Sequence, residues 1–250
     1  MKRKLAQGEI VIGTWIRNLR SNYLVHMIAQ SGFDFVYIDM EHSSMSLERV
    51  ADLCFVAQLS GLIPIVRPAG KLPHLISKPL DCGAMGLLIP HVDIPEEARD
   101  IVRYAKFHPL GERGMNLQGV HTGFTVPDGQ LFIETMNRES ILIVQIESKK
   151  GIDHIDEILS VEGIDGAVIG RADLSQDLKI PGQTNHPKVL ECVERLIEAC
   201  KKRSAYPGLL VNDIKGAKEW IGKGIKIVPF GNATSIMMRA YKEIVSGLRS

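Results

Sequence analysis

The chain has 250 residues, of which 45% are hydrophobic, and its 30 basic and 29 acidic side chains nearly cancel. It can therefore bury a large core, while its balanced charge excludes strong attraction to nucleic acid or to an anionic membrane. No apolar run approaches membrane-spanning length, and no secretory segment follows the basic start, so we expect a cytoplasmic protein that acts on small molecules.

Short apolar runs along the chain predict eight strands. They are Ile10–Ile16, Phe35–Asp39, Ile63–Arg67, Gly86–Pro90, Ile141–Glu147, Gly166–Gly170, Pro207–Val211 and Ile225–Phe230. Segments with helical periodicity lie between most of them, among them Ser46–Ser60, Pro95–Lys106, Ile152–Ser160, Val189–Lys201 and Ile214–Lys223. Strands that alternate with helices indicate a parallel sheet, and no Gly-rich nucleotide-binding turn follows the first strand. We therefore predict one (β/α)8 TIM-barrel domain over residues 1–250.

Polar side chains stand where the predicted strands end. In chain order they are Arg17, Asp39, Glu41, His42, Arg67, His91, Glu147, Asp173, Asn212 and Asn232. Barrel active sites are built from the carboxyl ends of different strands, so this set is the candidate active site. The long segment from Phe107 to Asp128 is either a plain surface loop or a direct contact to substrate.

Two carboxylates in this set have the pattern of a cation site. Gln145 and Glu147 are two residues apart on one strand, so both project toward the pocket, and Asp173 lies just beyond the next strand. A divalent ion such as Mg²⁺ or Mn²⁺, bound by both carboxylates, would neutralise their buried negative charges. A structural salt bridge from Glu147 to Arg67 or Arg171 would resolve it as well.

Three further residues have candidate catalytic roles. Arg67 ends a strand, where a guanidinium would hold a carboxylate or stabilise an enolate oxygen. His42 is the natural proton carrier, because imidazole titrates near neutral pH. Asp81 ends the helix before the fourth strand and is a candidate to orient His42, although spacing alone does not establish that pairing.

An ordered set of motifs over nearly the whole chain resembles the HpcH/HpaI aldolase family of metal-dependent class II aldolases. The motifs are Asp39-Met40-Glu41-His42, Val66-Arg67-Pro68, Leu80-Asp81-Cys82-Gly83, Gly111-Glu112-Arg113-Gly114, Val144-Gln145-Ile146-Glu147 and the segments 161–166 and 169–175. The resemblance implies a TIM barrel of the phosphoenolpyruvate/pyruvate type. It also implies retro-aldol cleavage of a 4-hydroxy-2-oxo acid to pyruvate and an aldehyde.

The resemblance assigns roles to the candidate residues. Glu147 and Asp173 would bind Mg²⁺, Mn²⁺ or Co²⁺, which chelates the pyruvyl unit and stabilises its enolate. His42 would accept a proton with Asp81 raising its basicity, and Arg67 would stabilise the transition-state charge. The substrate would be positioned by Gln145, Arg171, Ala172 and Asp173. Relatives form hexamers that exchange C-terminal helices, which implies a homo-oligomer with residues 234–248 as the exchanged element.

The chain departs from the family pattern at Arg171, at Ala233 and in the segment after Gly114, which lacks the Arg-rich pattern of typical members, and several functions stay open. Arg171 replaces a proline beside Asp173, where it would bind an acidic acceptor or distort the loop, and Ala233 replaces a common aspartate. Lys149 is a candidate for a Schiff-base aldolase. Lysis of a β-hydroxyacyl-CoA is a further possible reaction, and a barrel of this kind could also bind a metabolite without catalysis.

Overall fold

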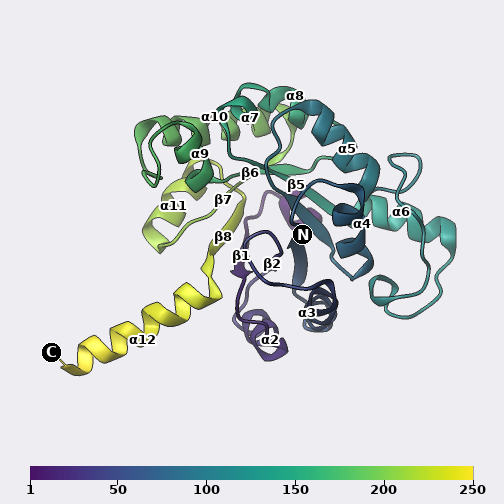
Figure 1. Cartoon of the computed structure of the whole chain (residues 1–250), viewed down its shortest axis with the longest axis horizontal. Coiled ribbons are helices and arrows are strands. Elements are labelled where there is room, and N and C mark those ends of the chain that lie inside the picture. Colours follow the sequence, from purple (N-terminus) through teal and green to yellow (C-terminus); the bar gives the residue numbers. More distant parts are fainter. Residues whose placement is uncertain (250) are drawn as a thin grey trace.

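A computed structural model describes residues 1–249 and confirms the predicted (β/α)8 barrel. Eight parallel strands close into a barrel in chain order, with the first strand paired to the last (Figure 1). The strands are β1 (Val11–Ile16), β2 (Phe35–Asp39), β3 (Ile63–Arg67), β4 (Gly86–Ile89), β5 (Ile141–Ile146), β6 (Gly166–Ile169), β7 (Tyr206–Leu209) and β8 (Ile227–Asn232).

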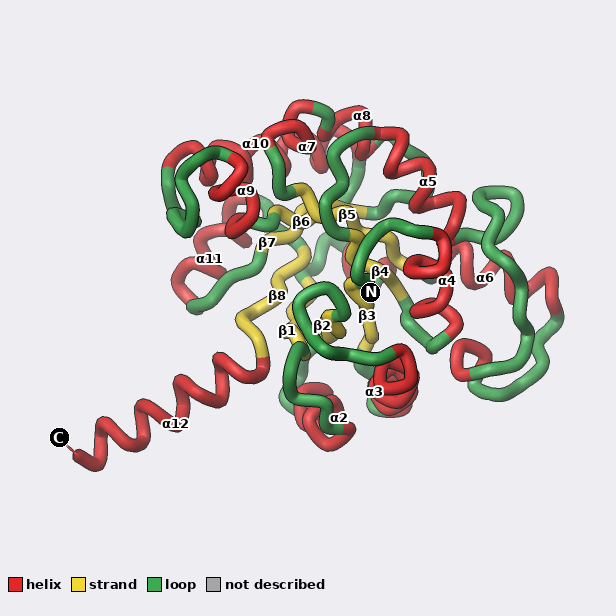
Figure 2. Tube along the Cα trace, viewed as in Figure 1, coloured by secondary structure: helices red, strands yellow, loops and turns green. Residues whose placement is uncertain are grey.

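Most of the helices surround this barrel on the outside, as Figure 2 shows by the red elements around the yellow strands. In chain order, the helices of the described residues are α1 (Lys2–Ala6), α2 (Asn22–Gln30), α3 (Leu47–Leu59), α4 (Pro73–Asp81), α5 (Pro95–Ala105), the 3-10 helix η1 (Val120–Thr122), α6 (Gly129–Glu139), α7 (Lys149–Asp153), α8 (Ile155–Leu159), α9 (Arg171–Asp177), α10 (Pro187–Arg203), α11 (Ile214–Lys223) and α12 (Ala233–Arg249).

Local sequence signals set most of these boundaries. Ser46 caps α3 by accepting a hydrogen bond from the Arg49 backbone N–H, and Asp213 caps α11 in the same way. The predicted helix over 152–160 is wrong in one respect, because the chain breaks at His154 into the two short helices α7 and α8. Strand β7 begins and ends earlier than predicted, and β8 later, by one or two residues at each end.

Alternate residues of each strand fill the barrel interior. On β5, Ile141 and Ile143 belong to the apolar cluster inside the barrel, while Leu142 and Val144 belong to the larger cluster between the strands and the helices. Successive side chains of a strand point to opposite faces, so Gln145 continues the inward row. The same alternation holds on β2.

Polar side chains replace apolar ones where these inward rows reach the carboxyl ends of the strands. Asp39 follows the interior residue Tyr37 by two positions, Arg67 follows Ile65, and Glu147 continues the row of β5. All three polar side chains are buried. The barrel interior is thus apolar along most of its length and charged at the carboxyl ends of the strands, where α/β barrels carry their active sites.

Helix α12 lies apart from the barrel. It projects away from the other elements (yellow in Figure 1), and Ala233 is its one buried residue among 233–249. No helix among residues 1–249 combines the length and apolar character needed to cross a membrane.

Candidate active site

A buried ion pair between Asp39 and Arg67 forms the floor of the site. The Arg67 guanidinium donates two hydrogen bonds to the carboxylate, from Nε to Oδ1 at 2.9 Å and from Nη2 to Oδ2 at 2.6 Å. Burial opposes ionisation of Asp39, but the hydrogen bonds and charge of Arg67 keep the pKa of this carboxyl below its ordinary value. The two-point contact fixes the guanidinium plane.

Arg67 is also held from its other sides. Its carbon Cζ lies 4.6 Å from the centre of the Trp15 ring, and Arg17 contributes a second cation 2.8 Å from Asp39 Oδ2. The remaining nitrogen, Nη1, lies 2.9 Å from Glu41 Oε2 and 3.5 Å from Gln145 Oε1, toward the carboxyl ends of the strands. One donor-bearing edge of Arg67 is therefore directed at the mouth of the barrel.

Glu147 is a buried carboxylate with no arginine or lysine partner among residues 1–249. Its Oε2 accepts a hydrogen bond from Gln145 Nε2 at 2.7 Å, and its Oε1 accepts one from the His91 backbone N–H at 2.9 Å. Burial raises the pKa of Glu147 to about 7 against the influence of His91, and the negative charges of Asp173 and Glu41 add to the rise. The salt bridge from Glu147 to Arg67 or Arg171 that the sequence left open is not formed.

The raised pKa of Glu147 predicts a stability effect that depends on pH. Its folded pKa of about 7 exceeds the ordinary value of 4.5, so its stabilising contribution is full below pH 4.5 and is lost as pH rises through 7. In chelator, Glu147→Gln should therefore be more stable than the unsubstituted protein at pH 8, by about 3 kcal/mol, and much less so at pH 5. Denaturant melts at both values measure this, and an equal difference at the two would contradict it.

Space for the Glu147 side chain is provided by Gly170, the residue after β6. A Cβ at this glycine would lie 2.2 Å from Glu147 Oε2 and 2.8 Å from Gln145 Nε2. Since Gly170 has φ of −87°, alanine would be tolerated by the backbone there and excluded only by these side chains. The absence of a side chain at position 170 thus creates the room around the carboxylate.

Gly170→Ala is therefore expected to displace Glu147 and to weaken divalent-cation binding by about 10- to 100-fold, with a folded barrel. Calorimetric titration with Mn²⁺ measures this change. Gly222→Ala is the matched control, because a Cβ at Gly222 meets nothing within 4 Å. Unchanged Mn²⁺ affinity in Gly170→Ala would show that this contact does not shape the site.

Glu41 and His91 lie next to Glu147, although their sequence positions marked them only as strand-end residues. The ring of His91 lies between the two carboxylates, with Nε2 3.0 Å from Glu41 Oε1 and Nδ1 3.1 Å from Glu147 Oε1. A ligand atom from each of the three residues lies within 4.8 Å of the others. Their position within two residues of the ends of β2, β4 and β5 is the sequence signal for this cluster.

The structure separates His42 from Asp81 within one chain. His42 lies at the mouth with a half-exposed ring whose Nε2 is 3.8 Å from Glu41 Oε2. Asp81 ends α4, which runs back to the amino end of the barrel, and there it pairs with Arg113 Nη2 at 2.6 Å. A contact between Asp81 and His42 would require the aspartate of a second copy.

Arg171, Ala172 and Asp173 form the first turn of α9, beyond β6. The Arg171 guanidinium turns away from Glu147 and donates to Asn185 Oδ1 at 3.0 Å and to the Leu210 carbonyl oxygen at 2.9 Å. Asp173 is half-buried, makes no ion pair within residues 1–249, and is close enough to add to the rise in the pKa of Glu147. Asp173, the second predicted metal ligand, therefore interacts electrostatically with Glu147, although it lies outside the cluster of Glu41, His91 and Glu147.

This donor set fits a divalent cation. Glu147 and Asp173 are two carboxylates without an arginine or lysine partner among residues 1–249, and Gly170 leaves space beside the first. Carboxylate oxygens are the ligands that Mg²⁺ and Mn²⁺ prefer, and a cation removes the cost of burying Glu147 in its ionised form.

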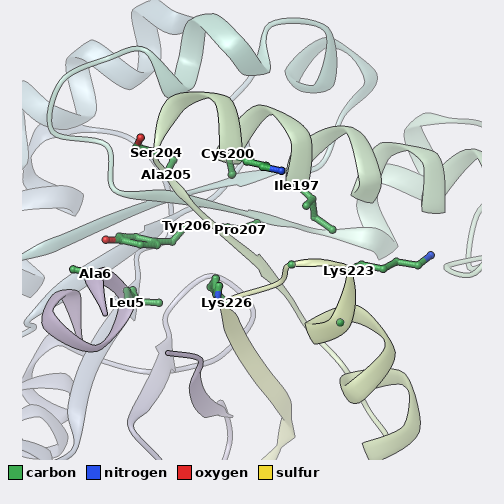
Figure 3. Close-up of a pocket in the computed structure, with 13 residues that line it drawn as sticks. Leu5, Ala6, Ile197, Cys200, Ser204, Ala205, Tyr206, Pro207, Lys223 and Lys226 are labelled. Carbon is green, nitrogen blue, oxygen red and sulfur yellow. The ribbon is translucent and has the colours of Figure 1, made fainter. Parts of the chain in front are cut away.

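Other candidate sites in the barrel do not match this chemistry. A pocket of about 510 Å³ lies at the amino ends of the strands, lined by residues such as Leu5, Cys200 and Tyr206 (Figure 3). Lys149 is exposed and paired with Asp153 on the outside, unlike the desolvated amine of a Schiff-base enzyme. Burial lowers the pKa of Lys106 to about 7. Its Nζ donates hydrogen bonds to Ser140 and to the Asn137 carbonyl oxygen, just before the amino end of β5 and away from the site.

Comparisons with known proteins identify the family and the fold of this chain. A family model described as HpcH/HpaI aldolase/citrate lyase matches residues 12–240. A 2-keto-3-deoxy-L-rhamnonate aldolase of Escherichia coli is 33% identical over 100% of this chain and 92% of its own. A 4-hydroxy-2-oxo-heptane-1,7-dioate aldolase of Escherichia coli is 32% identical over 98% and 93%. The crystal structure of an HpcH/HpaI aldolase from Desulfitobacterium hafniense superimposes with a TM-score of 0.95 at 31% identity, covering 100% of this chain and 96% of that one.

Proposed function

The chain belongs to the HpcH/HpaI aldolase/citrate lyase family and is a lyase of the aldolase type, and on that premise we propose that it cleaves a 4-hydroxy-2-oxo acid into pyruvate and an aldehyde with a divalent cation as cofactor. The names of the two relatives support the substrate class, because both describe 2-oxo acids with an oxygen on carbon 4. The aldehyde that this chain releases is a separate question.

The observation that carries the proposal is the buried Glu147, close to Asp173, with no arginine or lysine partner for either carboxylate among residues 1–249. Glu147 and Asp173 would hold Mg²⁺, Mn²⁺ or Co²⁺. A bound ion of this kind supplies Lewis acidity toward the carboxylate and keto oxygens of a 2-oxo acid. The site needs that chemistry, because its own cations, Arg67 and Arg17, are largely committed to Asp39.

The side chains of the site have separate tasks in the cleavage. Arg67, fixed by Asp39, points Nη1 into the mouth, where it would stabilise the negative charge that develops on the keto oxygen. His42 would take the proton of the 4-hydroxyl group as the bond between carbons 3 and 4 breaks, since its half-exposed ring lies at the mouth of the barrel and is not directed at Glu147. A proton must then return to carbon 3 to give pyruvate.

Gln145 and the first turn of α9 would position the substrate. Gln145 connects Arg67 to Glu147 through its amide, so it sets the distance between the two groups. The backbone N–H of Ala172 lies in the first turn of a helix, where it has no intrahelical acceptor and suits an anion. Arg171 contributes indirectly, because its bonds to Asn185 and Leu210 tie this turn to the end of β7.

Exchange of the methyl protons of pyruvate for deuterium tests the proposal without knowledge of the aldehyde. Protein loaded with Mg²⁺, Mn²⁺ or Co²⁺ should catalyse the exchange in D₂O, followed by proton NMR, and chelator should stop it. Binding of pyruvate or oxalate without exchange would instead indicate a metabolite-binding barrel. Thioester-dependent turnover would indicate a β-hydroxyacyl-CoA lyase, and borohydride trapping on a lysine would indicate a Schiff-base enzyme.

We also propose that the protein is a homo-oligomer, a hexamer by family analogy, in which α12 packs on a neighbouring copy. Met238, Tyr241, Ile244, Val245 and Leu248 are exposed apolar residues of α12. Their spacing puts them on one side of the helix, and an exposed apolar stripe of this kind marks an interaction surface. The four free cysteines support a reducing, cytoplasmic location.

Ile244→Asp is therefore expected to dissociate the oligomer, because it places a charge in the centre of the apolar side of α12. Sedimentation velocity should show a shift to smaller species. Ser246→Asp adds the same charge on the opposite side of the helix and should leave the assembly intact. Equal sedimentation of all three proteins would contradict the role of this face.

A further inference from the structure

His91 is the least ordinary residue of the candidate site. It directly follows Pro90 at the end of β4, and its φ is +55°, in the left-handed region that non-glycine residues rarely adopt. Such a conformation persists where surrounding contacts hold it, and it is concentrated at functional sites. The backbone of His91 must therefore be held by its neighbours, and the direction of its ring is a clue to its role.

Contacts on both sides of the backbone fix the conformation. The N–H of His91 donates to Glu147 Oε1 at 2.9 Å, and its carbonyl oxygen accepts from Lys71 Nζ at 2.5 Å. Lys71 is in turn paired with Glu97 on α5. The strained backbone is thus held by one bond to a candidate cation ligand and one to a lysine that is itself anchored.

The ring of His91 is directed into the cluster of carboxylates. Nδ1 lies 3.1 Å from Glu147 Oε1, and Nε2 lies 3.0 Å from Glu41 Oε1. Arg67 fixes Glu41, because Arg67 Nη1 lies 2.9 Å from Glu41 Oε2. One ring nitrogen is therefore next to the buried carboxylate, while the other is oriented by a second carboxylate that Arg67 holds in place.

This is the arrangement by which proteins orient a histidine ligand, whose second nitrogen usually donates to a carboxylate. We infer that His91 Nδ1 is a ligand of the divalent cation beside Glu147 and Asp173, with Glu41 as its orienting partner, and this assignment rests on the proposed function. The site then has one nitrogen and two carboxylate donors from protein, and not oxygen donors alone.

A nitrogen donor changes which ions the site prefers. Imidazole suits Co²⁺, Ni²⁺ and Zn²⁺, whereas Mg²⁺ favours oxygen ligands, so the site should bind Co²⁺ much more tightly than Mg²⁺. Replacing His91 with Asn should lower Co²⁺ affinity by about 10- to 100-fold and change Mg²⁺ affinity far less. Asparagine is chosen because it tolerates the left-handed backbone conformation.

Pulsed EPR of the Mn²⁺-loaded full chain gives a readout that does not depend on activity. The unsubstituted protein should show hyperfine coupling to one imidazole ¹⁴N, and labelling of histidine with ¹⁵N should change that signal even if no variant folds. The coupling should be lost in His91→Asn. It should persist in His42→Gln, the matched control, because His42 is the other imidazole at the mouth.

The outcomes separate this inference from the proposed function. Mn²⁺ binding without nitrogen coupling in the unsubstituted protein would overturn the role of His91 and leave the carboxylate site standing. Coupling that survives in His91→Asn would assign the nitrogen to another residue and would overturn it as well. Failure of the unsubstituted protein to bind any divalent ion would overturn both.

Discussion

Replacing Glu147 with Gln is expected to lower the rate of pyruvate deuterium exchange by about 1,000-fold or more and to abolish tight binding of divalent cations. The glutamine keeps the size of the side chain but removes the buried negative charge that the proposed ion neutralises. A loss of this size corresponds to about 4 kcal/mol of transition-state stabilisation, within the range that a Lewis acid supplies. Exchange measured by NMR and Mn²⁺ titration by calorimetry give the two readouts.

Three further variants define the cause of that loss. Asp173→Asn should weaken both readouts in the same way, because it removes the second carboxylate. His42→Ala should slow exchange while ion binding survives, since the ring lies at the rim and not beside Glu147. Glu157→Gln, on the surface of α8, is the matched control and should change neither. Full exchange activity in Glu147→Gln would refute the proposed site.

Replacing Arg67 with Lys should reduce the exchange rate by about 100- to 1,000-fold, the size of effect seen when one preorganised donor is lost. Lysine keeps the positive charge, but it cannot bond both oxygens of Asp39 and also present a nitrogen to Glu41 and Gln145. The expected signature is a fall in kcat with ion affinity nearly unchanged. Steady-state exchange kinetics with a parallel Mn²⁺ titration measure it.

Arg17→Lys is the comparison for Arg67→Lys. Arg17 contacts Asp39 through a single nitrogen at 2.8 Å and is partly exposed, so a lysine can replace that contact. We expect a change of less than about 5-fold in exchange, in keeping with the small contribution of partly exposed ion pairs. If Arg17→Lys loses as much activity as Arg67→Lys, the loss does not depend on the two-point contact that is particular to Arg67.

The alternation of inward-facing and outward-facing residues along each strand explains why much of the site could be predicted from the sequence. Each strand's inward side is fixed by its period of two, so the polar residue that ends a row must reach the barrel mouth. This period places Gln145 and Glu147 on one side of β5, and Arg67 lies at the end of its strand as predicted. It did not apply to Asp81, which lies on a helix that returns to the amino end of the barrel.

The barrel and the set of polar residues at its mouth were predictable from the chain alone, because strand periodicity and the alternation of strands and helices are local properties of a sequence. The contacts among those residues became known only from the fold: Arg67 pairs with Asp39, Arg171 turns outward, and His91 bridges Glu41 and Glu147. Those contacts depend on the stagger of strands around the closed barrel and on side-chain rotamers. Neither is specified by residues that are near in sequence.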